Sequence, residues 1–431
     1  MSSHAALVDG GAAPPPSRAR LRSRRWAVVG ALSVTETVSY GILYYAFAAF
    51  LVPMQRDLGF SAAQLTGAFS LSLLVAAGVG ILVGRHLDRH APRALMTCGS
   101  VAGVLLVLAW SRVESLAALY AVWFALGVVM AMVLYEVAFT VLAKAFPEPG
   151  ERRRAMTAMT LVAALASFIF LPLSQALIDA YGWRDALVVL AAILGVTTVP
   201  LHALALRLAP AEPSSAARDD SPAVPAGEAL RSPPFWMLSV AFFLASLAAI
   251  AMMVFSIPFL VERGHSAAFA AFALGLVGVS QIPGRVLFGP LAGRLPRPQA
   301  TAAVFVLIAA GIAIVVSVHA TWAVVAGLVL LGMGNGMGTL ARATAIADLY
   351  GGKAYGTIAG VAASMSTSAR AGGPLAAAVF AAALGYEALL WTLAGIAALA
   401  AVLAYRAESL AKEADQESGR GASGRRIFTR S

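Results

Sequence analysis

Apolar stretches long enough to span a membrane alternate with short polar segments along almost the whole chain. A helix needs about 20 apolar residues to cross a hydrocarbon layer of about 30 Å. Most of the apolar stretches reach this length, which predicts an all-α integral membrane protein. We predict twelve transmembrane helices, over residues 26–53, 61–83, 94–111, 116–145, 154–180, 186–207, 235–261, 267–292, 300–318, 322–347, 354–384 and 386–405.

The composition agrees with this pattern. Of the 431 residues, 60% are hydrophobic and only 12% are charged, and the mean hydropathy is +0.81. These values are typical of a membrane protein rather than of a soluble domain. The single Cys98 excludes a disulfide framework, and the six histidines form no metal-binding or catalytic motif. We therefore expect no cofactor, no metal site and no enzymatic activity.

A polar segment in the middle of the chain separates six predicted helices from six others. Residues 208–234 are rich in Pro, Ala, Ser and charge, as in a flexible linker. The two halves resemble each other: ERRRAMTAMTLVAA at 151–164 resembles GGKAYGTIAGVAAS at 351–364, and Gly182-Trp183 matches Gly385-Tyr386. We expect two six-helix bundles, with the linker between them and a tail at each end, over residues 1–25, 26–207, 208–234, 235–405 and 406–431. Parallel six-helix repeats favour a transporter with its substrate site between the bundles.

The basic residues predict the orientation. If the N-terminus is cytoplasmic, four of the 31 lysines and arginines fall outside, three lie within spans, and the remaining 24 are cytoplasmic. This distribution follows the positive-inside rule, so we expect a multi-pass protein of the cell membrane (plasma or inner) with both termini in the cytoplasm. The net charge of +10 is then explained by topology and contact with anionic lipid, not by nucleic-acid binding. We expect a monomer.

Five charged residues interrupt spans that are otherwise apolar. An arginine at the centre of a transmembrane helix costs about 2.5–3.5 kcal/mol on insertion scales, so such residues face a cavity, a counter-charge or an anionic ligand. They occur in predicted spans one, four, eight, ten and eleven: Glu36, Glu136, Arg285, Arg342 and Arg370. The sequence therefore predicts that something charged moves through the protein.

The arginines suit the recognition of a carboxylate. A guanidinium group is a planar fork of donors that stays charged at physiological pH. Gln281 lies one helical turn before Arg285, and Ser366 and Thr367 lie one turn before Arg370. The alternative for both arginines is a structural ion pair, and Arg342 could also extend to the cytoplasmic surface.

The acidic residues allow three interpretations. Glu36, Tyr40 and Tyr44 have the spacing of one helical stripe, and Glu136 has Thr140 one turn later. Each carboxyl group could carry a coupling proton, form an ion pair with Arg342 or Arg370, or be solvated in a water-filled cavity.

The loop after the second predicted span carries a recognisable motif. It reads GRHLDRHAPR over residues 84–93 and resembles the cytoplasmic signature of the major facilitator superfamily at Gly84, Asp88, Arg89 and Arg93. Asp88 could accept hydrogen bonds from helix N-terminal amides and pair with a cation across the bundles, as a breakable latch. The alternative is a basic loop that only sets the topology. In the matching loop of the second half, GPLAGRLPR, Gly293 replaces the aspartate.

A narrower resemblance is to the monocarboxylate porters and the oxalate:formate antiporter. Four stretches carry it: SYGILYYAFAAFLVPMQRDLGFS, PLSQALIDAYGWRDAL, QIPGRVLFGPLAGRL and DLYGGKAYGTIAG. In those families an arginine in span eight and a cation in span eleven hold the substrate carboxylate, and Arg285 and Arg370 stand at the matching places. Gln281 stands where the monocarboxylate porters have an aspartate, and Tyr44 lies near the position of their span-one lysine.

The sequence thus predicts a secondary transporter of a small organic anion, a mono- or dicarboxylate, working by alternating access as a proton symporter or an anion exchanger. The resemblance and the physics together suggest that Arg285, Arg370, Gln281, Tyr40 and Tyr44 bind the substrate. One alternative is a proton-coupled efflux carrier for drugs or neutral metabolites, although its central charges would be acids rather than arginines. Another is a non-transporting membrane sensor or scaffold.

The basic-residue asymmetry generates a first prediction. Single cysteines at Ser214, in the linker, and at Val318, between predicted spans nine and ten, should react with an impermeant reagent from opposite sides of the membrane. Equal labelling of both from outside intact cells would contradict the predicted topology.

Overall fold

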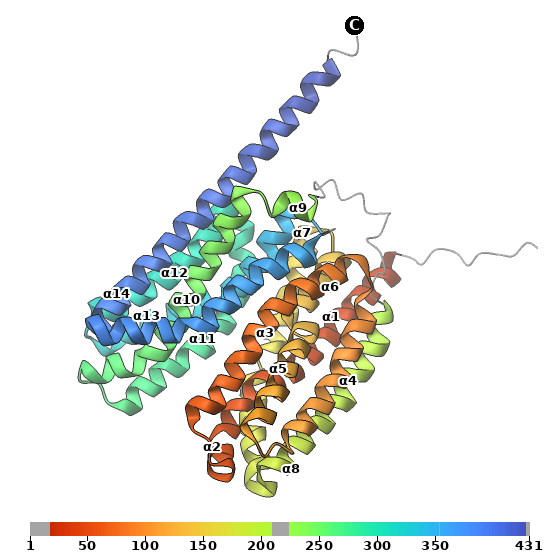
Figure 1. Cartoon of the computed structure of the whole chain (residues 1–431). Coiled ribbons are helices and arrows are strands. Elements are labelled where there is room, and N and C mark those ends of the chain that lie inside the picture. Colours follow the sequence, from red (N-terminus) through yellow and green to blue (C-terminus); the bar gives the residue numbers. More distant parts are fainter. Residues whose placement is uncertain (1–17, 209–223, 353, 428–431) are drawn as a thin grey trace, which may run out of the picture.

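The computed structural model describes residues 18–208, 224–352 and 354–427. Throughout these segments the regular secondary structure is helical, with no strand, so the predicted fold class is confirmed (Figure 1). Most of the predicted linker, residues 209–223, lies outside the described residues, as do residues 1–17 of the N-terminal tail and the last four residues of the chain.

The N-terminal bundle contains a short π-helical turn, η1, within its first crossing. Its elements are α1 (Arg18–Tyr40), η1 (Gly41–Tyr45), α2 (Ala46–Leu58), α3 (Ala62–Arg89), α4 (Pro92–Trp110), α5 (Leu116–Val133), α6 (Tyr135–Ala145), α7 (Pro149–Ala163) and α8 (Ala166–Leu204).

The C-terminal bundle follows a 3-10 turn and a short surface helix. These two elements are η2 (Ala205–Leu208) and α9 (Ala226–Ala229). The helices of the bundle are α10 (Pro233–Glu262), α11 (Ala267–Arg294), α12 (Arg297–Ser317), α13 (Thr321–Tyr350) and α14 (Tyr355–Ile427).

Two glycines each divide one long helical segment into two membrane crossings, so ten segments give twelve crossings. Among the described residues, ten segments are long and apolar enough to cross a membrane, and two of them contain 59 residues each. Each of these two contains one non-helical glycine, Gly182 with φ +77° or Gly385 with φ +83°. Only glycine adopts such angles readily, so the matched Gly-aromatic pairs of the two halves mark equivalent turns.

Two predicted spans are wrong in detail, because they are not continuous helices. The fourth crossing is interrupted at Leu134, whose ψ of −174° separates α5 from α6. The fifth is interrupted at Ala164 and Leu165, between α7 and α8. Neither break contains glycine or proline, so no local signal in the sequence predicted it. Helix α14 also continues beyond residue 405, where the last predicted span ends, as far as Ile427.

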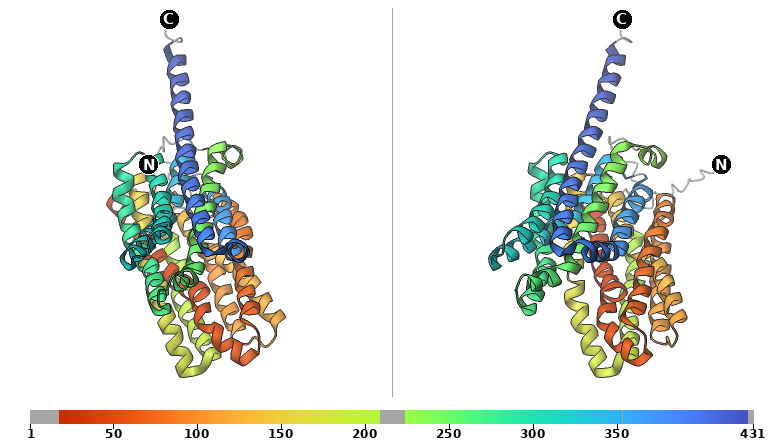
Figure 2. Two further views of the ribbon diagram at one scale, coloured as in Figure 1. Left: turned by 90° about the vertical axis from the view of Figure 1, so that its left-hand side faces the viewer. Right: turned by 60° about the vertical axis from the view of Figure 1, so that its left-hand side comes forward.

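The two bundles meet most closely at one end of the molecule. There α3 packs along the first part of α14, and α7 contacts α11 and α13. The start of α1, the helix α9 and the end of α14 lie at this same end, which we call the Asp88 end because Asp88 lies there (Figures 1 and 2). Toward the opposite end the bundles splay apart (Figures 1 and 2).

Glycines allow close packing within the C-terminal bundle. A Cβ atom at Gly332 would lie 2.4 Å from the Val277 carbonyl oxygen, and one at Gly336 would lie 2.4 Å from that of Gln281. The run GMGNGMG at 332–338 therefore lets α13 approach α11, as expected for small residues between transmembrane helices.

Candidate functional site

A cavity of about 370 Å³ lies between the two bundles. Its wall includes residues of α1, η1, α3, α5 and α6 from one bundle and of α10, α11, α13 and α14 from the other. Seven of the site residues predicted from the sequence line it: Tyr40, Tyr44, Glu136, Gln281, Arg285, Arg342 and Arg370. The structure thus brings them together, while their roles in binding and coupling stay predictions.

The N-terminal bundle contributes a cluster of tyrosines. The rings of Tyr40 and Tyr135 lie 4.4 Å apart between centroids, and those of Tyr44 and Tyr45 lie 5.1 Å apart. The π-helical turn η1 holds an extra residue compared with an α-helical turn, so Tyr44 and Tyr45 both line the cavity. There is no room for a side chain at Gly41 in this turn, because a Cβ atom there would lie 2.2 Å from the ring of Phe170.

The C-terminal bundle contributes the cations. Arg285 is only 7% exposed; its guanidinium donates to the backbone carbonyl of Thr160 in the other bundle at 2.7 Å, and its Nε has no partner among the described residues. Arg370 is exposed to the cavity and makes no hydrogen bond or ion pair with the part of the chain that the structure describes. Its donors are therefore available to a ligand.

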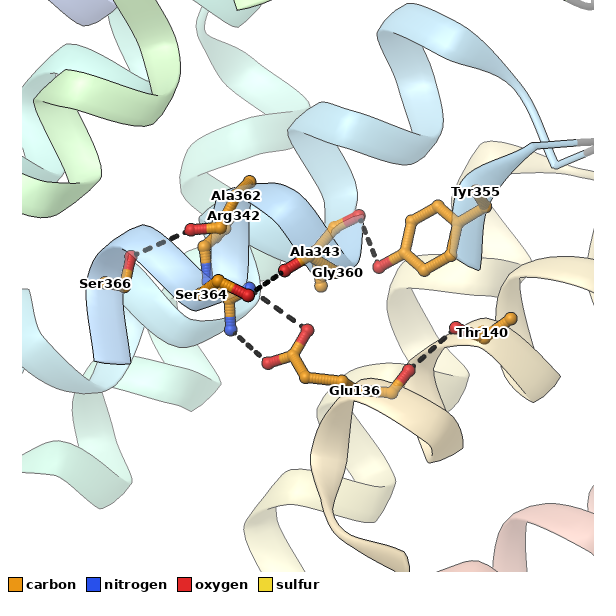
Figure 3. A network of polar contacts seen from close by, with 9 residues as sticks. All are labelled: Glu136, Thr140, Arg342, Ala343, Tyr355, Gly360, Ala362, Ser364 and Ser366. Carbon is orange, nitrogen blue, oxygen red and sulfur yellow. Dashed lines mark hydrogen bonds and ion pairs between the residues drawn. The ribbon is translucent and has the colours of Figure 1, made fainter. Parts of the chain in front are cut away.

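The third arginine forms an ion pair across the bundles. The two terminal nitrogens of Arg342 reach the two carboxylate oxygens of Glu136 at 2.5 and 3.1 Å, a bidentate arrangement (Figure 3). Glu136 is in the first turn of α6, which begins in mid-crossing because of the break at Leu134. The partial positive charge of a helix N-terminus adds to the stabilisation of this carboxylate. Arg342 therefore lies in the cavity wall rather than extending to the surface.

Glu36 is not among the described residues that line the cavity, although it lies one helical turn before Tyr40 on α1. Its side chain is fully buried, and neither carboxylate oxygen has a hydrogen-bond partner among the described residues. Glu136 lies close enough for repulsion if both groups were ionised.

The cavity wall has an excess of positive charge. Three guanidinium groups face one carboxylate, and that carboxylate is already paired with Arg342. The charges of Arg285 and Arg370 are left without a counter-ion among the described residues. In a low-dielectric region such a pair attracts an anion strongly.

Asp88 joins the two bundles at the end where they meet. One carboxylate oxygen accepts from the amide of Gly356 at 2.9 Å, and the other accepts from the amide and hydroxyl of Thr357 at 2.8 and 2.6 Å. These donors are in the first turn of α14, where backbone amides lack helical partners. Gly84 permits this approach, since a Cβ there would lie 2.0 Å from the Gly356 carbonyl oxygen.

The other two motif residues make no contact across the bundles. The Nε of Arg93 donates to the Ala203 carbonyl near the end of α8 at 2.8 Å, within its own bundle. Arg89 is exposed and has no hydrogen-bond partner in the described segments. A second tie across the bundles instead comes from Arg152 and Asp348, which form a largely buried ion pair.

Sequence reasoning missed six polar residues of the cavity wall: Tyr45, Tyr135, Ser246, Asn335, Thr339 and Ser364. Asn335 and Thr339 were recoverable, because they precede Arg342 by seven and three residues and so share its helical face. The glycines that flank Asn335 instead predicted only close packing between helices. Tyr45 and Tyr135 reach the cavity through the π-turn and the break at Leu134, which have no local sequence signal.

Comparison with known proteins identifies the family. The model of the Major Facilitator Superfamily matches residues 34–374 and 305–430. The chain belongs to the Major Facilitator Superfamily. The resemblance of the Asp88 loop to the signature of this family is thereby explained.

Curated relatives of this chain are named as two carboxylate transporters and an efflux pump. It is 27% identical over 268 residues to the oxalate:formate antiporter of Oxalobacter formigenes, 60% of each chain. It is 29% identical over 282 residues to monocarboxylate transporter 13 of Bos taurus, covering 64% of this chain and 63% of the relative. An MFS-type efflux pump of Mycolicibacterium smegmatis is 29% identical over 281 residues, with 63% of each covered. The matches thus span less than two thirds of each relative.

Solved structures share the fold. The transporter FucP in its outward conformation superposes with a TM-score of 0.67 at 16% identity, over 89% of this chain and 99% of FucP. The human organic anion transporter MFSD10 gives a TM-score of 0.64 at 16% identity, over 90% and 100% of the two chains. At this identity the likeness describes architecture alone.

The contacts of Asp88 generate a second prediction. Asp88→Asn removes the negative charge that faces the amides of α14, so the closed Asp88 end loses stability while the cavity is untouched. We expect transport turnover to change several-fold and the substrate Kd to stay within about twofold, as for a change in a conformational step. Asp57→Asn is the matched control, because Asp57 pairs with Arg184 within one bundle at the opposite end. Unchanged turnover in Asp88→Asn would leave the loop with a topological role alone.

Proposed function

We propose that this protein is a secondary transporter of a small organic anion, with a carboxylate group held between Arg285 and Arg370. The observation that carries the proposal is the pair of uncompensated guanidinium groups in a cavity between the two bundles. The position between two bundles suits alternating access, in which the bundles rock around a central site.

The donors around the cavity fit a carboxylate ligand. Arg370 has all its donors available, and Arg285 uses one terminal nitrogen for the Thr160 carbonyl and leaves its Nε without a partner. Guanidinium groups bind carboxylates in a bidentate manner. The phenols of Tyr40 and Tyr44 on the facing bundle add neutral donors. A volume of about 370 Å³ suits a small anion rather than a large amphipathic solute.

Two relatives support the same substrate class. The oxalate:formate antiporter and monocarboxylate transporter 13 are both named for small carboxylates. The arginines of this chain stand at the positions where the resemblance to these families places the cations that hold the carboxylate. The coupling is either proton symport, for which the buried Glu36 is the candidate carrier, or exchange of one anion for another.

We further propose that the Asp88 end faces the cytoplasm, together with both termini, in a cell membrane. The excess of basic residues at this end supports that orientation. The ties formed by Asp88 and by Arg152 with Asp348 then hold the carrier closed on its cytoplasmic side.

A proton-coupled efflux carrier is the second candidate. It is favoured by the relationship to a mycobacterial efflux pump and by the aromatic wall of the cavity. The excess of positive charge argues against it, since cationic or neutral solutes gain nothing from two free guanidinium groups. Uptake of labelled mono- and dicarboxylates into proteoliposomes, with and without a pH gradient or internal counter-anion, separates the two functions and the two modes of coupling.

The anion site generates a third prediction. Arg370→Lys keeps the charge but loses the planar fork, so carboxylate binding should weaken by about 1.5–3 kcal/mol, the value of a charged hydrogen bond. Arg370→Gln should weaken carboxylate binding more than Arg370→Lys does. The corresponding Arg285→Lys and Arg285→Gln variants should weaken binding in the same order. The Arg370 variants should melt at the wild-type temperature, because this side chain has no described partner to lose.

The outcome also tests the structural alternative. If the arginines serve only as ion-pair partners, the Gln variants should fold poorly and recover when Glu36 or Glu136 is neutralised as well. Wild-type carboxylate affinity in both Gln variants would reject the anion site and favour the efflux carrier.

A further inference from the structure

A second hollow of the described structure lies outside the cavity between the two bundles. It is a groove of about 750 Å³ between α11 and α12, and its floor includes the nearly buried Met337 of α13. Both helices pack along α13 but make little contact with each other, which leaves the groove open. Its walls are apolar, with Leu287, Leu291 and Val306 among them.

The groove has the depth of one membrane leaflet. Along α11 it extends from Arg294 back to Leu287, and along α12 from Gln299 to Leu307. At 1.5 Å per residue these stretches are roughly 10–12 Å long. Half of a hydrocarbon layer of about 30 Å is about 15 Å. The groove therefore begins near the Asp88 end and extends into the hydrocarbon, where the surrounding solvent is lipid.

The mouth of the groove is polar and carries a free cation. Arg294, Gln299 and Tyr405 lie there, all exposed. Arg294 makes no hydrogen bond or ion pair with the described residues, whereas the neighbouring Arg297 lies close to the carboxylate of Glu408. Gly293 stands where the matching loop of the first half has Asp88, so the second loop has no acid of its own beside Arg294.

We propose that this groove binds an anionic phospholipid of the leaflet at the Asp88 end. An acyl chain lies along the apolar walls, and the phosphate pairs with Arg294, with Tyr405 at the depth of the headgroups. Arginine binds phosphate as a planar fork, and tyrosine is enriched at the membrane interface. The proposal depends on the groove alone and not on the transported substrate.

A lipid bound in the groove would pack against α11, the helix that carries Arg285. At 100° per residue, the α11 residues that line the groove lie roughly 140–240° around the helix from Arg285, on its opposite face. Pro283 and Pro290 interrupt the backbone hydrogen bonds of α11 at two places, which makes this helix easier to deform. A bound lipid chain thus packs behind α11 while the substrate cavity lies in front of it.

Lipid retention tests the proposal. The wild-type protein and variants are purified from membranes containing phosphatidylglycerol, washed in a delipidating detergent, and examined by native mass spectrometry. We expect the wild type and Arg294→Lys to retain one phosphatidylglycerol. Retention should fall about tenfold in Arg294→Gln, and also in Ala303→Phe, which fills the groove and leaves Arg294 in place. Adding dioleoyl phosphatidylglycerol should raise the Tm of the wild type more than adding phosphatidylcholine does.

Arg89→Gln is the matched control. Arg89 is also exposed and unpaired among the described residues, and it holds the corresponding position in the first-half loop. It should retain phosphatidylglycerol like the wild type. Wild-type retention in both Arg294→Gln and Ala303→Phe would overturn the proposal. An equal loss in Arg89→Gln would overturn it too, because the effect would then reflect overall charge.

Discussion

The ion pair between Arg342 and Glu136 is the interaction on which the rest of the site depends. It joins the two bundles inside the membrane, where an unpaired charge is costly, and both terminal nitrogens of the arginine take part. Removing one partner of such a pair typically costs about 3–5 kcal/mol, because the other charge is left buried. Among the described residues, the pair also occupies the one carboxylate of the cavity wall, so the other two arginines remain free for an anion.

The two bundles contribute to the site in different ways. In the N-terminal bundle, helices are irregular beside the cavity: the π-turn exposes Tyr45, and the break at Leu134 places Glu136 at a helix N-terminus. In the C-terminal bundle, α11, α13 and α14 stay helical past Arg285, Arg342 and Arg370. Neutral donors on the N-terminal bundle thus face cations on the C-terminal bundle, and a ligand between them contacts both bundles.

Much of the fold could be predicted from the sequence, because the length of apolar stretches and the chemistry of membranes leave few choices. The charged residues of five spans indicated the cavity, since lipid excludes them, and four of the five do line it. The prediction failed where packing between distant segments decides the outcome. Glu36 shares a helical face with Tyr40, yet it lies one turn nearer the end where the bundles meet and is fully buried there. The partner of Arg342 also could not be predicted, since two acids were compatible with the spacing and only the break at Leu134 directs Glu136 toward it.

A charge exchange between Glu136 and Arg342 tests the account most directly. Spin labels at His90 and Arg231, exposed positions at the Asp88 end of the two bundles, report how far the bundles separate. The distance between the two labels, measured by double electron–electron resonance, should lengthen in Glu136→Arg and in Arg342→Glu, because each single change places like charges together. The double variant should return to the wild-type distance. Single variants with the wild-type distance distribution would contradict the claim that this pair holds the bundles together.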